Sequence, residues 1–151
     1  MAKIPTIDDI HAARERISKY AYVTPLEHST DFSRLLGNDI SHKLENLQLT
    51  GSFKVRGALN AVLSLPKGEL AAGVIAASAG NHAQGVAFGA HQLGIKATIV
   101  MPLGTPLVKL MAVKRWGAEV VQTGETYDEA ADCAASMAHD TGACLIHPFD
   151  D

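Results

Sequence analysis

The residues best suited to chemistry are a single lysine and a short polar loop 24 positions after it. Lys54 follows the turn-forming run Thr50-Gly51-Ser52 and lies next to the aromatic Phe53. The loop Ser78-Ala79-Gly80-Asn81-His82 offers backbone N–H groups and short polar side chains where a strand leads into a helix. A nucleophilic amine together with an anion-binding loop is what Schiff-base chemistry on an amino acid requires.

Each segment also has an ordinary interpretation, and spacing alone leaves both open. Lys54 could be a surface lysine near the start of a helix. Its position argues against this, because a cation there faces the unfavourable end of the helix dipole. The loop 78–82 could be a plain strand-to-helix turn in which Asn81 caps the helix, since many α/β proteins have such a turn at this edge of the sheet.

The chain from about residue 53 onward alternates predicted helices and strands. The predicted strands are 73–77, 97–101, 118–122 and 143–147, and the predicted helices are 52–65, 81–93, 105–116 and 126–140. The third helix has Thr105 as its expected N-cap and Pro106 at its first position, and the fourth begins with a capping box of Thr126 and Glu129. This alternation predicts an α/β fold with a parallel four-stranded sheet and crossover helices.

Smaller patterns predict how these elements pack. Gly85 and Gly89 lie four residues apart on one helix, which predicts a close approach of that helix to the sheet. We expect four further residues to be buried in the core: Leu107, Leu110, Met111 and Trp116, the single tryptophan. Before residue 53, the pattern predicts a helix over 7–20, opened by Thr6 and Asp9, and a strand over 40–44.

Composition excludes several classes of function. The 151 residues are 47% hydrophobic and 19% charged, which suits one globular domain with its own core. A net charge of −3 and 5% aromatic residues argue against a nucleic-acid partner. No apolar run approaches the roughly 18 residues of a membrane span and no signal segment is apparent, so we expect a cytoplasmic protein without a membrane partner. Cys133 and Cys144 lack ligand spacing and predict ordinary thiols, without a metal site.

Two stretches resemble the signature segments of pyridoxal-phosphate enzymes of the tryptophan-synthase β fold type. They are Ser52-Phe53-Lys54-Val55-Arg56-Gly57-Ala58 and Ser78-Ala79-Gly80-Asn81-His82-Ala83-Gln84-Gly85, and they are most similar to those of serine/threonine dehydratases. The resemblance extends, in order, through Thr24-Pro25-Leu26, Leu44-Glu45-Asn46-Leu47-Gln48, Met101-Pro102, Gly117-Ala118-Glu119-Val120-Val121 and His147-Pro148-Phe149-Asp150-Asp151.

The resemblance implies a role for each residue of the two segments. Lys54 would carry pyridoxal 5'-phosphate and act as the catalytic base, with Phe53 packed against the cofactor ring. Asn81 would contact the phenolic oxygen of the cofactor. The loop Ser78, Ala79, Gly80, Asn81 and His82 would bind the carboxylate of the substrate. Ala79 stands where related racemases tend to have a serine, and its side chain has no proton to give, which favours elimination over racemisation.

The implied reaction is the dehydration and deamination of L-threonine and L-serine to a 2-oxo acid and ammonia. Family members are about twice this length, and their second half carries the glycine-rich phosphate loop and the residue facing the pyridine nitrogen. The chain therefore resembles an N-terminal half. In that interpretation residues 1–52 belong to an incomplete large domain and residues 53–151 form the small α/β domain.

Two other hypotheses stay open. The chain could be a catalytically inactive remnant or interaction module that folds through 53–147 but cannot hold the cofactor productively. Apolar surface in the N-terminal 50 residues would then be exposed, and in either case we expect association into a homo-oligomer. A nucleotide-binding Rossmann-like domain is the weaker hypothesis, because no GxGxxG follows a strand and no acidic residue stands at the expected ribose position.

Overall fold

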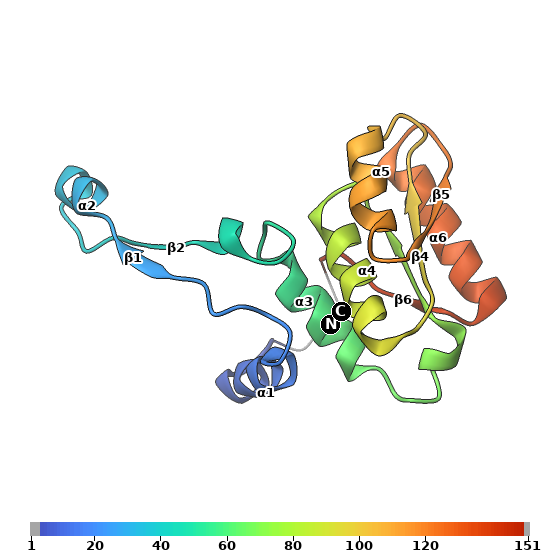
Figure 1. Cartoon of the computed structure of the whole chain (residues 1–151), viewed down its shortest axis with the longest axis horizontal. Coiled ribbons are helices and arrows are strands. Elements are labelled where there is room, and N and C mark those ends of the chain that lie inside the picture. The colour runs from blue at the N-terminus through green and yellow to red at the C-terminus, as the bar shows by residue number, and fades with distance from the viewer. Residues whose placement is uncertain (1–3, 150–151) are drawn as a thin grey trace.

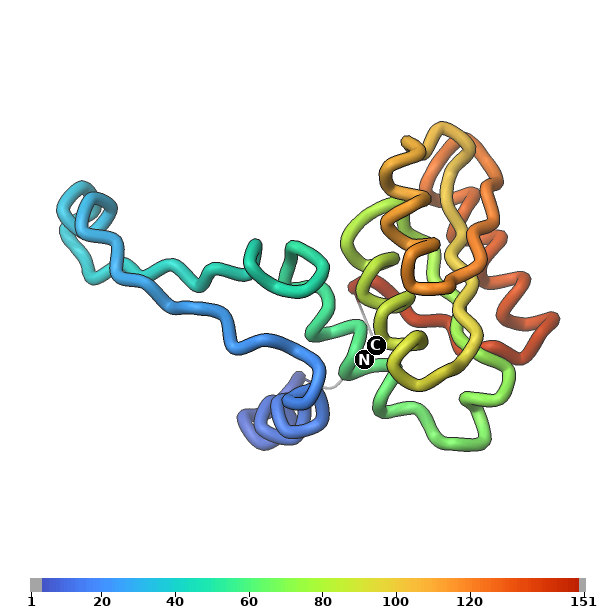
Figure 2. Tube along the Cα trace, viewed as in Figure 1, coloured from blue at the N-terminus to red at the C-terminus, as the bar shows by residue number. Residues whose placement is uncertain are grey.

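The computed structural model describes residues 4–149 as an α/β body with an extended N-terminal arm (Figures 1 and 2). Asp150 and Asp151 lie outside the described part; they are the last two residues of the segment 147–151, which resembles the dehydratase family. The elements are, in order, α1 Ile7–Ile17, β1 Leu26–His28, α2 Thr30–Leu36, β2 Ser41–Lys43, the 3-10 helix η1 Glu45–Leu47, α3 Lys54–Ser64, the 3-10 helix η2 Leu70–Ala72, β3 Val74–Ala77, α4 Asn81–Leu93, β4 Ala97–Met101, α5 Leu107–Lys114, β5 Glu119–Gln122, α6 Tyr127–Thr141 and β6 Cys144–Leu145.

The body is built on a parallel four-stranded sheet, which confirms the predicted fold class. The strand order is β5-β4-β3-β6, and every neighbouring pair is parallel. Val74 is opposite Ala97 and Ala77 is opposite Val100 in the central pair. All residues of β3 and β4 are buried. Their apolar runs are explained by helices covering both faces of the sheet.

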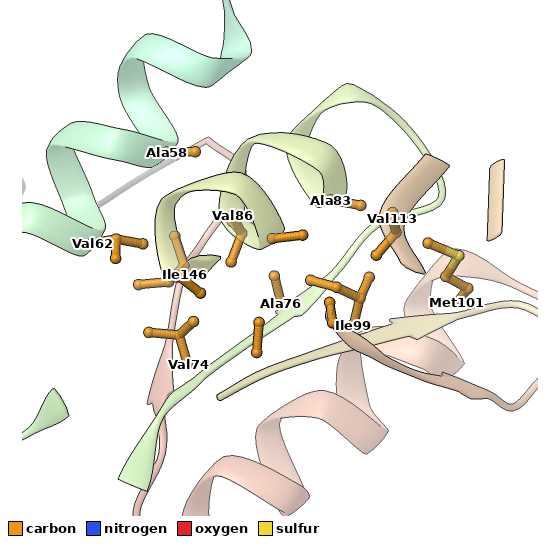
Figure 3. Packing of buried hydrophobic residues seen from close by; sticks show 14 of the residues in the cluster. Ala58, Val62, Val74, Ala76, Ala83, Val86, Ile99, Met101, Val113 and Ile146 are labelled. Atoms are coloured by element: carbon orange, nitrogen blue, oxygen red, sulfur yellow. The ribbon is translucent and has the colours of Figure 1, made fainter. Parts of the chain in front are cut away.

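Side chains of the central strands alternate between two cores, because successive residues of a strand point to opposite faces. Val74 and Ala76 pack with Ile99 under α4 and α5, where Val86 and Val113 complete the cluster (Figure 3). On the other face, three further strand residues pack against Ala130 and Ala134 of α6: Ile75, Ala77 and Val100. The small alanines let α6 lie close to the sheet.

The glycines of α4 face a helix rather than the sheet, so that prediction was wrong. A Cβ placed on Gly85 would lie 2.8 Å from Cβ of Ala58 and 3.2 Å from Cα of Val55, both in α3. A Cβ on Gly89 would meet Val62 of α3 at 3.5 Å. The glycines therefore set the spacing between α3 and α4, the two helices that begin with the candidate chemical segments.

Two of the three predicted N-caps are found in the structure. Both capping boxes form: Thr6 with Asp9 at α1, and Thr126 with Glu129 at α6. Helix α5 instead begins at Leu107 with Pro106 in the N-cap position, so the predicted cap by Thr105 was wrong by one residue.

The predicted core stripe on α5 is only partly buried. Leu110 lies in the core, and Trp116 is packed against it. Leu107 and Met111 are exposed, by 71% and 57%, and so do not belong to the core. Helical spacing placed these residues on one side of α5, but it could not determine how much of that side the sheet covers.

The N-terminal arm holds two elements that the sequence did not predict, β1 and α2. Strand β1 pairs antiparallel with β2, and α2 connects them without burying any residue. Before the arm, α1 packs on the body: Ile17 and Ala21 join Leu59 of α3 and Phe88 of α4 in one cluster. The arm thus projects from the body while α1 is fixed to it (Figure 1).

No helix among residues 4–149 is both long enough and apolar enough to cross a membrane.

Candidate active site

Lys54 and the loop 78–82 lie at the same edge of the body because α3 packs along α4. Lys54 is the first residue of α3, and the loop connects the carboxyl end of β3 to the first turn of α4. The close approach at Gly85, where a Cβ would meet the carbonyl oxygen of Lys54 at 3.3 Å, fixes the two helix starts side by side. Ligands of open α/β sheets bind at this carboxyl edge of the strands.

The amine of Lys54 is held by the segment that follows β6. Its Nζ donates a hydrogen bond to the carbonyl oxygen of Pro148 at 2.9 Å. Nζ also lies 5.0 Å from the ring centre of Phe149 and 5.6 Å from that of Phe53. The amine is therefore held against the protein near two aromatic rings, and does not extend into bulk solvent as an ordinary surface lysine would.

The loop 78–82 presents donors at the start of α4. The hydroxyl of Ser78 accepts a hydrogen bond from the N–H of Gly80 at 3.1 Å. Gly80, and not Asn81, occupies the N-cap position, so the interpretation of Asn81 as a helix cap is wrong. Asn81 is exposed, and no hydrogen bond engages its side chain within the described residues. First-turn N–H groups of a helix lack helical partners and favour an anion.

His82 differs from the rest of the loop because it is buried. Its Nε2 lies 3.0 Å from the carbonyl oxygen of Ile146, the residue directly after β6. This contact joins the start of α4 to the segment that holds Lys54. Because a carbonyl oxygen can only accept, this contact is a hydrogen bond in which a protonated Nε2 of His82 donates.

Two adjoining cavities surround Lys54. The larger, of about 600 Å³, runs along α3 beside Gly57, Ala61 and Leu65, and the smaller, of about 370 Å³, borders the loop at Ser78, Ala79 and Asn81. Both are lined by the same five residues at their junction: Phe53, Lys54, His82, Pro148 and Phe149. Volumes of a few hundred Å³ are typical of small-molecule sites.

An ion-pair network behind the site was not found by sequence reasoning. Arg56, two residues after Lys54, donates from Nε to Oε2 of Glu45 at 2.8 Å and from a terminal nitrogen to Oε1 at 2.8 Å. Thr24 also donates to this carboxylate, at 2.5 Å. The bidentate bond from Arg56 lowers the pKa of Glu45 from 4.5 to about 2, although burial opposes the shift. The only signal in the sequence was the resemblance of the segments that contain Glu45 and Thr24.

A buried glutamine extends this network to the arm. Gln48 accepts from the N–H of Tyr22 at 3.0 Å and donates to the carbonyl oxygen of Tyr22 at 2.9 Å. Arg56 donates to the same carbonyl oxygen at 2.9 Å. The loop that leads into Lys54 is therefore anchored to residues before the arm by charged and amide hydrogen bonds.

Tyr127 also lies at the site and was not found by sequence reasoning. It is the first residue of α6 and lines the smaller cavity together with the loop 78–82. The capping box marked the start of this helix, but only the fold shows that α6 begins at the same edge of the sheet as α4.

The donor set fits an anionic aromatic aldehyde such as pyridoxal phosphate. Lys54 supplies the amine, Phe53 an aromatic face exposed by 59%, and Asn81 an amide without a partner in the described residues. No cluster of His, Cys, Asp and Glu suited to a metal ion occurs within residues 4–149.

Comparison with known proteins agrees with this donor set. A family model described as "Pyridoxal-phosphate dependent enzyme" matches residues 17–151. The chain is 52% identical over 142 residues to an L-threonine ammonia-lyase of Geobacter sulfurreducens, which covers 94% of this chain and 35% of the relative.

Solved structures of pyridoxal-phosphate dependent enzymes are also similar to this chain. The processed form of threonine deaminase isoform 2 from Solanum lycopersicum has a TM-score of 0.85 and 40% identity, covering 100% of this chain and 46% of that one. Maize serine racemase has a TM-score of 0.92 and 34% identity, covering 99% of this chain and 45% of that one. The chain thus spans less than half the length of each of these proteins.

Proposed function

Because the chain belongs to the family of pyridoxal-phosphate dependent enzymes, we propose that it supplies the amine and the carboxylate-binding loop of an ammonia-lyase for L-threonine, and also for L-serine. The position of the Lys54 amine carries the proposal. The amine lies near two aromatic rings at the junction of two cavities, one of which borders the loop 78–82. The name of the Geobacter sulfurreducens relative, L-threonine ammonia-lyase, supports threonine as the substrate.

The residues of the site divide the work of binding and proton transfer. When bound, pyridoxal phosphate supplies an aldehyde that condenses with amines and a ring that accepts electrons. Phe53 would pack against that ring, and Asn81 would donate to its phenolic oxygen. The loop N–H groups and the Ser78 hydroxyl bind the carboxylate of the amino acid. Nζ of Lys54 would then take the proton from Cα, and the β-hydroxyl of threonine would leave as water. The enamine that is released takes up one water to give 2-oxobutanoate and ammonia.

Ala79 decides between elimination and racemisation in this proposal. Racemisation needs a second proton donor on the face of Cα opposite Lys54. Ala79 lines the smaller cavity with a methyl group, which cannot exchange a proton. The similarity to maize serine racemase makes racemisation the second candidate, and formation of D-serine is the observation that separates the two.

The test is release of 2-oxo acid from L-threonine and L-serine with added pyridoxal phosphate. The 151-residue chain is assayed alone and after co-expression with the part of the Geobacter sulfurreducens relative that lies beyond the match. Lys54-dependent 2-oxobutanoate in either sample supports the proposal, with Lys54→Ala as the blank. No product in either sample contradicts it and favours the inactive remnant or interaction module.

We further propose that residues 1–52 form part of a larger domain, that 53–151 form the small domain, and that the protein is a cytoplasmic homo-oligomer. Helix α2 buries no residue, and Leu35 and Leu36 are largely exposed on it. Such an arm requires a partner surface to stabilise it. Sedimentation at several concentrations should show association, and Leu35→Glu should weaken it; a monomer at all concentrations contradicts the oligomer.

A further inference from the structure

The hydroxyl of Tyr127 is a polar group at the site that the proposed reaction does not yet use. Tyr127 lies on the wall of the smaller cavity, where Ser78, Ala79 and Asn81 also lie, and it does not line the larger cavity. It is 41% exposed, and no hydrogen bond joins its hydroxyl to another residue of the described chain. A phenol at the mouth of a cavity with no protein partner is available to a ligand.

The backbone at Tyr127 is fixed more firmly than its place at the end of a loop would suggest. The carboxylate of Glu129 accepts from the N–H of Glu125 at 2.5 Å and from the N–H of Thr126 at 3.3 Å. The hydroxyl of Thr126 accepts from the N–H of Glu129 at 3.3 Å. These bonds hold both residues before Tyr127, so its ring is presented from a rigid turn.

We propose that the Tyr127 hydroxyl donates a hydrogen bond to the carboxylate of the substrate, opposite the donors of the loop 78–82. This inference rests on the proposed function, because it assigns a second anchor to the same carboxylate. The helices that begin at this cavity, α4 and α6, come from opposite faces of the sheet. The carboxylate would thus be held from both faces, by backbone N–H groups on one side and a phenol on the other.

The carboxylate is the part of the substrate best suited to accept a hydrogen bond from Tyr127. A neutral phenol donates to an anion without the repulsion that a carboxylate side chain would cause, and such charge-assisted bonds are the stronger ones. Loss of one hydrogen bond to a charged group weakens binding by about tenfold or more. The aromatic ring alone would not discriminate between a carboxylate and a neutral group of similar size.

The test compares two ligands that differ only at the carboxylate and lack a leaving group: L-2-aminobutanoate and L-2-aminobutanol. Each is titrated into the ¹⁵N-labelled 151-residue chain with pyridoxal phosphate, and the amide signals of residues 78–82 report binding. Tyr127→Phe should weaken L-2-aminobutanoate about tenfold and change L-2-aminobutanol by less than about twofold. Tyr22→Phe, at an exposed tyrosine absent from both cavity linings, should change neither.

Three results overturn the inference. Equal affinity of wild type and Tyr127→Phe for L-2-aminobutanoate would show that the hydroxyl makes no bond to the carboxylate. Equal weakening of both ligands would show that Tyr127 only shapes the cavity. If wild type itself shows no carboxylate-dependent shift at residues 78–82, the proposed substrate site fails and this inference fails with it; only that third result affects the proposed function.

Discussion

The spacing of α3 and α4 at Gly85 gives a quantitative prediction that links the fold to the site. Replacing Gly85 by alanine places a Cβ 2.8 Å from Cβ of Ala58, 3.2 Å from Cα of Val55 and 3.3 Å from the carbonyl oxygen of Lys54. None of these atoms can rotate away, because two are backbone atoms and the third is an alanine methyl. Helix α3 must therefore shift away from α4.

The magnitude follows from two opposing effects. Overpacking of a well-filled interface costs about 1–3 kcal/mol. Alanine is favoured over glycine inside a helix by about 1 kcal/mol. We expect Gly85→Ala to lower the free energy of unfolding by up to about 2 kcal/mol.

A matched control lies on the same helix. Gly89→Ala keeps the propensity gain, but its nearest neighbour, Cβ of Val62, is at an ordinary contact distance of 3.5 Å. It should be neutral or stabilising by up to about 1 kcal/mol.

Urea unfolding followed by the fluorescence of Trp116 measures both variants. This side chain packs edge-on against Phe88 of α4, with ring centres 4.9 Å apart, and so reports on that helix. If Gly85→Ala were as stable as Gly89→Ala, the close contact between α3 and α4 would be refuted. Because α3 begins at Lys54, Gly85→Ala should also reduce covalent labelling of that lysine by pyridoxal phosphate.

Two further predictions concern the anchors of the site. Because the folded state lowers the pKa of Glu45 to about 2, its ion pair contributes stability above the ordinary pKa of 4.5, and this contribution is lost as pH falls from about 4.5 to 2. The free energy of unfolding of wild type, measured with urea, should fall by about 1–2 kcal/mol more than that of Glu45→Gln over this pH range. The difference is kept this small because solvent reaches Arg56 and screens the ion pair. If the free energies of both proteins changed in parallel with pH, the stabilising ion pair would be refuted. Thr126→Ala should cost about 1 kcal/mol by removing the cap of α6. Ser29→Ala, at an N-cap without a side-chain bond, should cost clearly less, and equal costs would argue against the capping box.

The regular part of the body was predictable because its patterns are local. Helix α4 has the predicted bounds, 81–93, since a buried strand precedes it and Gly94 ends it in the left-handed conformation. Both capping boxes were readable because their two partners are three residues apart. The short strand β1 and helix α2 were not readable, because an arm that buries almost nothing has no hydrophobic period.

The site was predictable only where one segment carries the chemistry. Lys54 and the loop 78–82 could be singled out from residue types, and their specific roles followed from the resemblance alone. Tyr127 and Glu45 could not be placed, because their positions depend on which helices and loops meet at one edge of the sheet. The segment 146–149 contacts both Lys54 and His82. Its first two residues belonged to the predicted strand 143–147, and neither that pattern nor the resemblance at its end indicated these contacts.

We propose above that Lys54 is the residue that joins pyridoxal phosphate. The direct measurement is incubation of the 151-residue chain with the cofactor, reduction with borohydride, and peptide mapping of the covalent label. We expect one dominant site at Lys54, a visible absorbance band before reduction, and loss of both in Lys54→Ala. Label spread over exposed lysines such as Lys96, with none enriched at Lys54, would contradict it and leave the chain as a folded remnant.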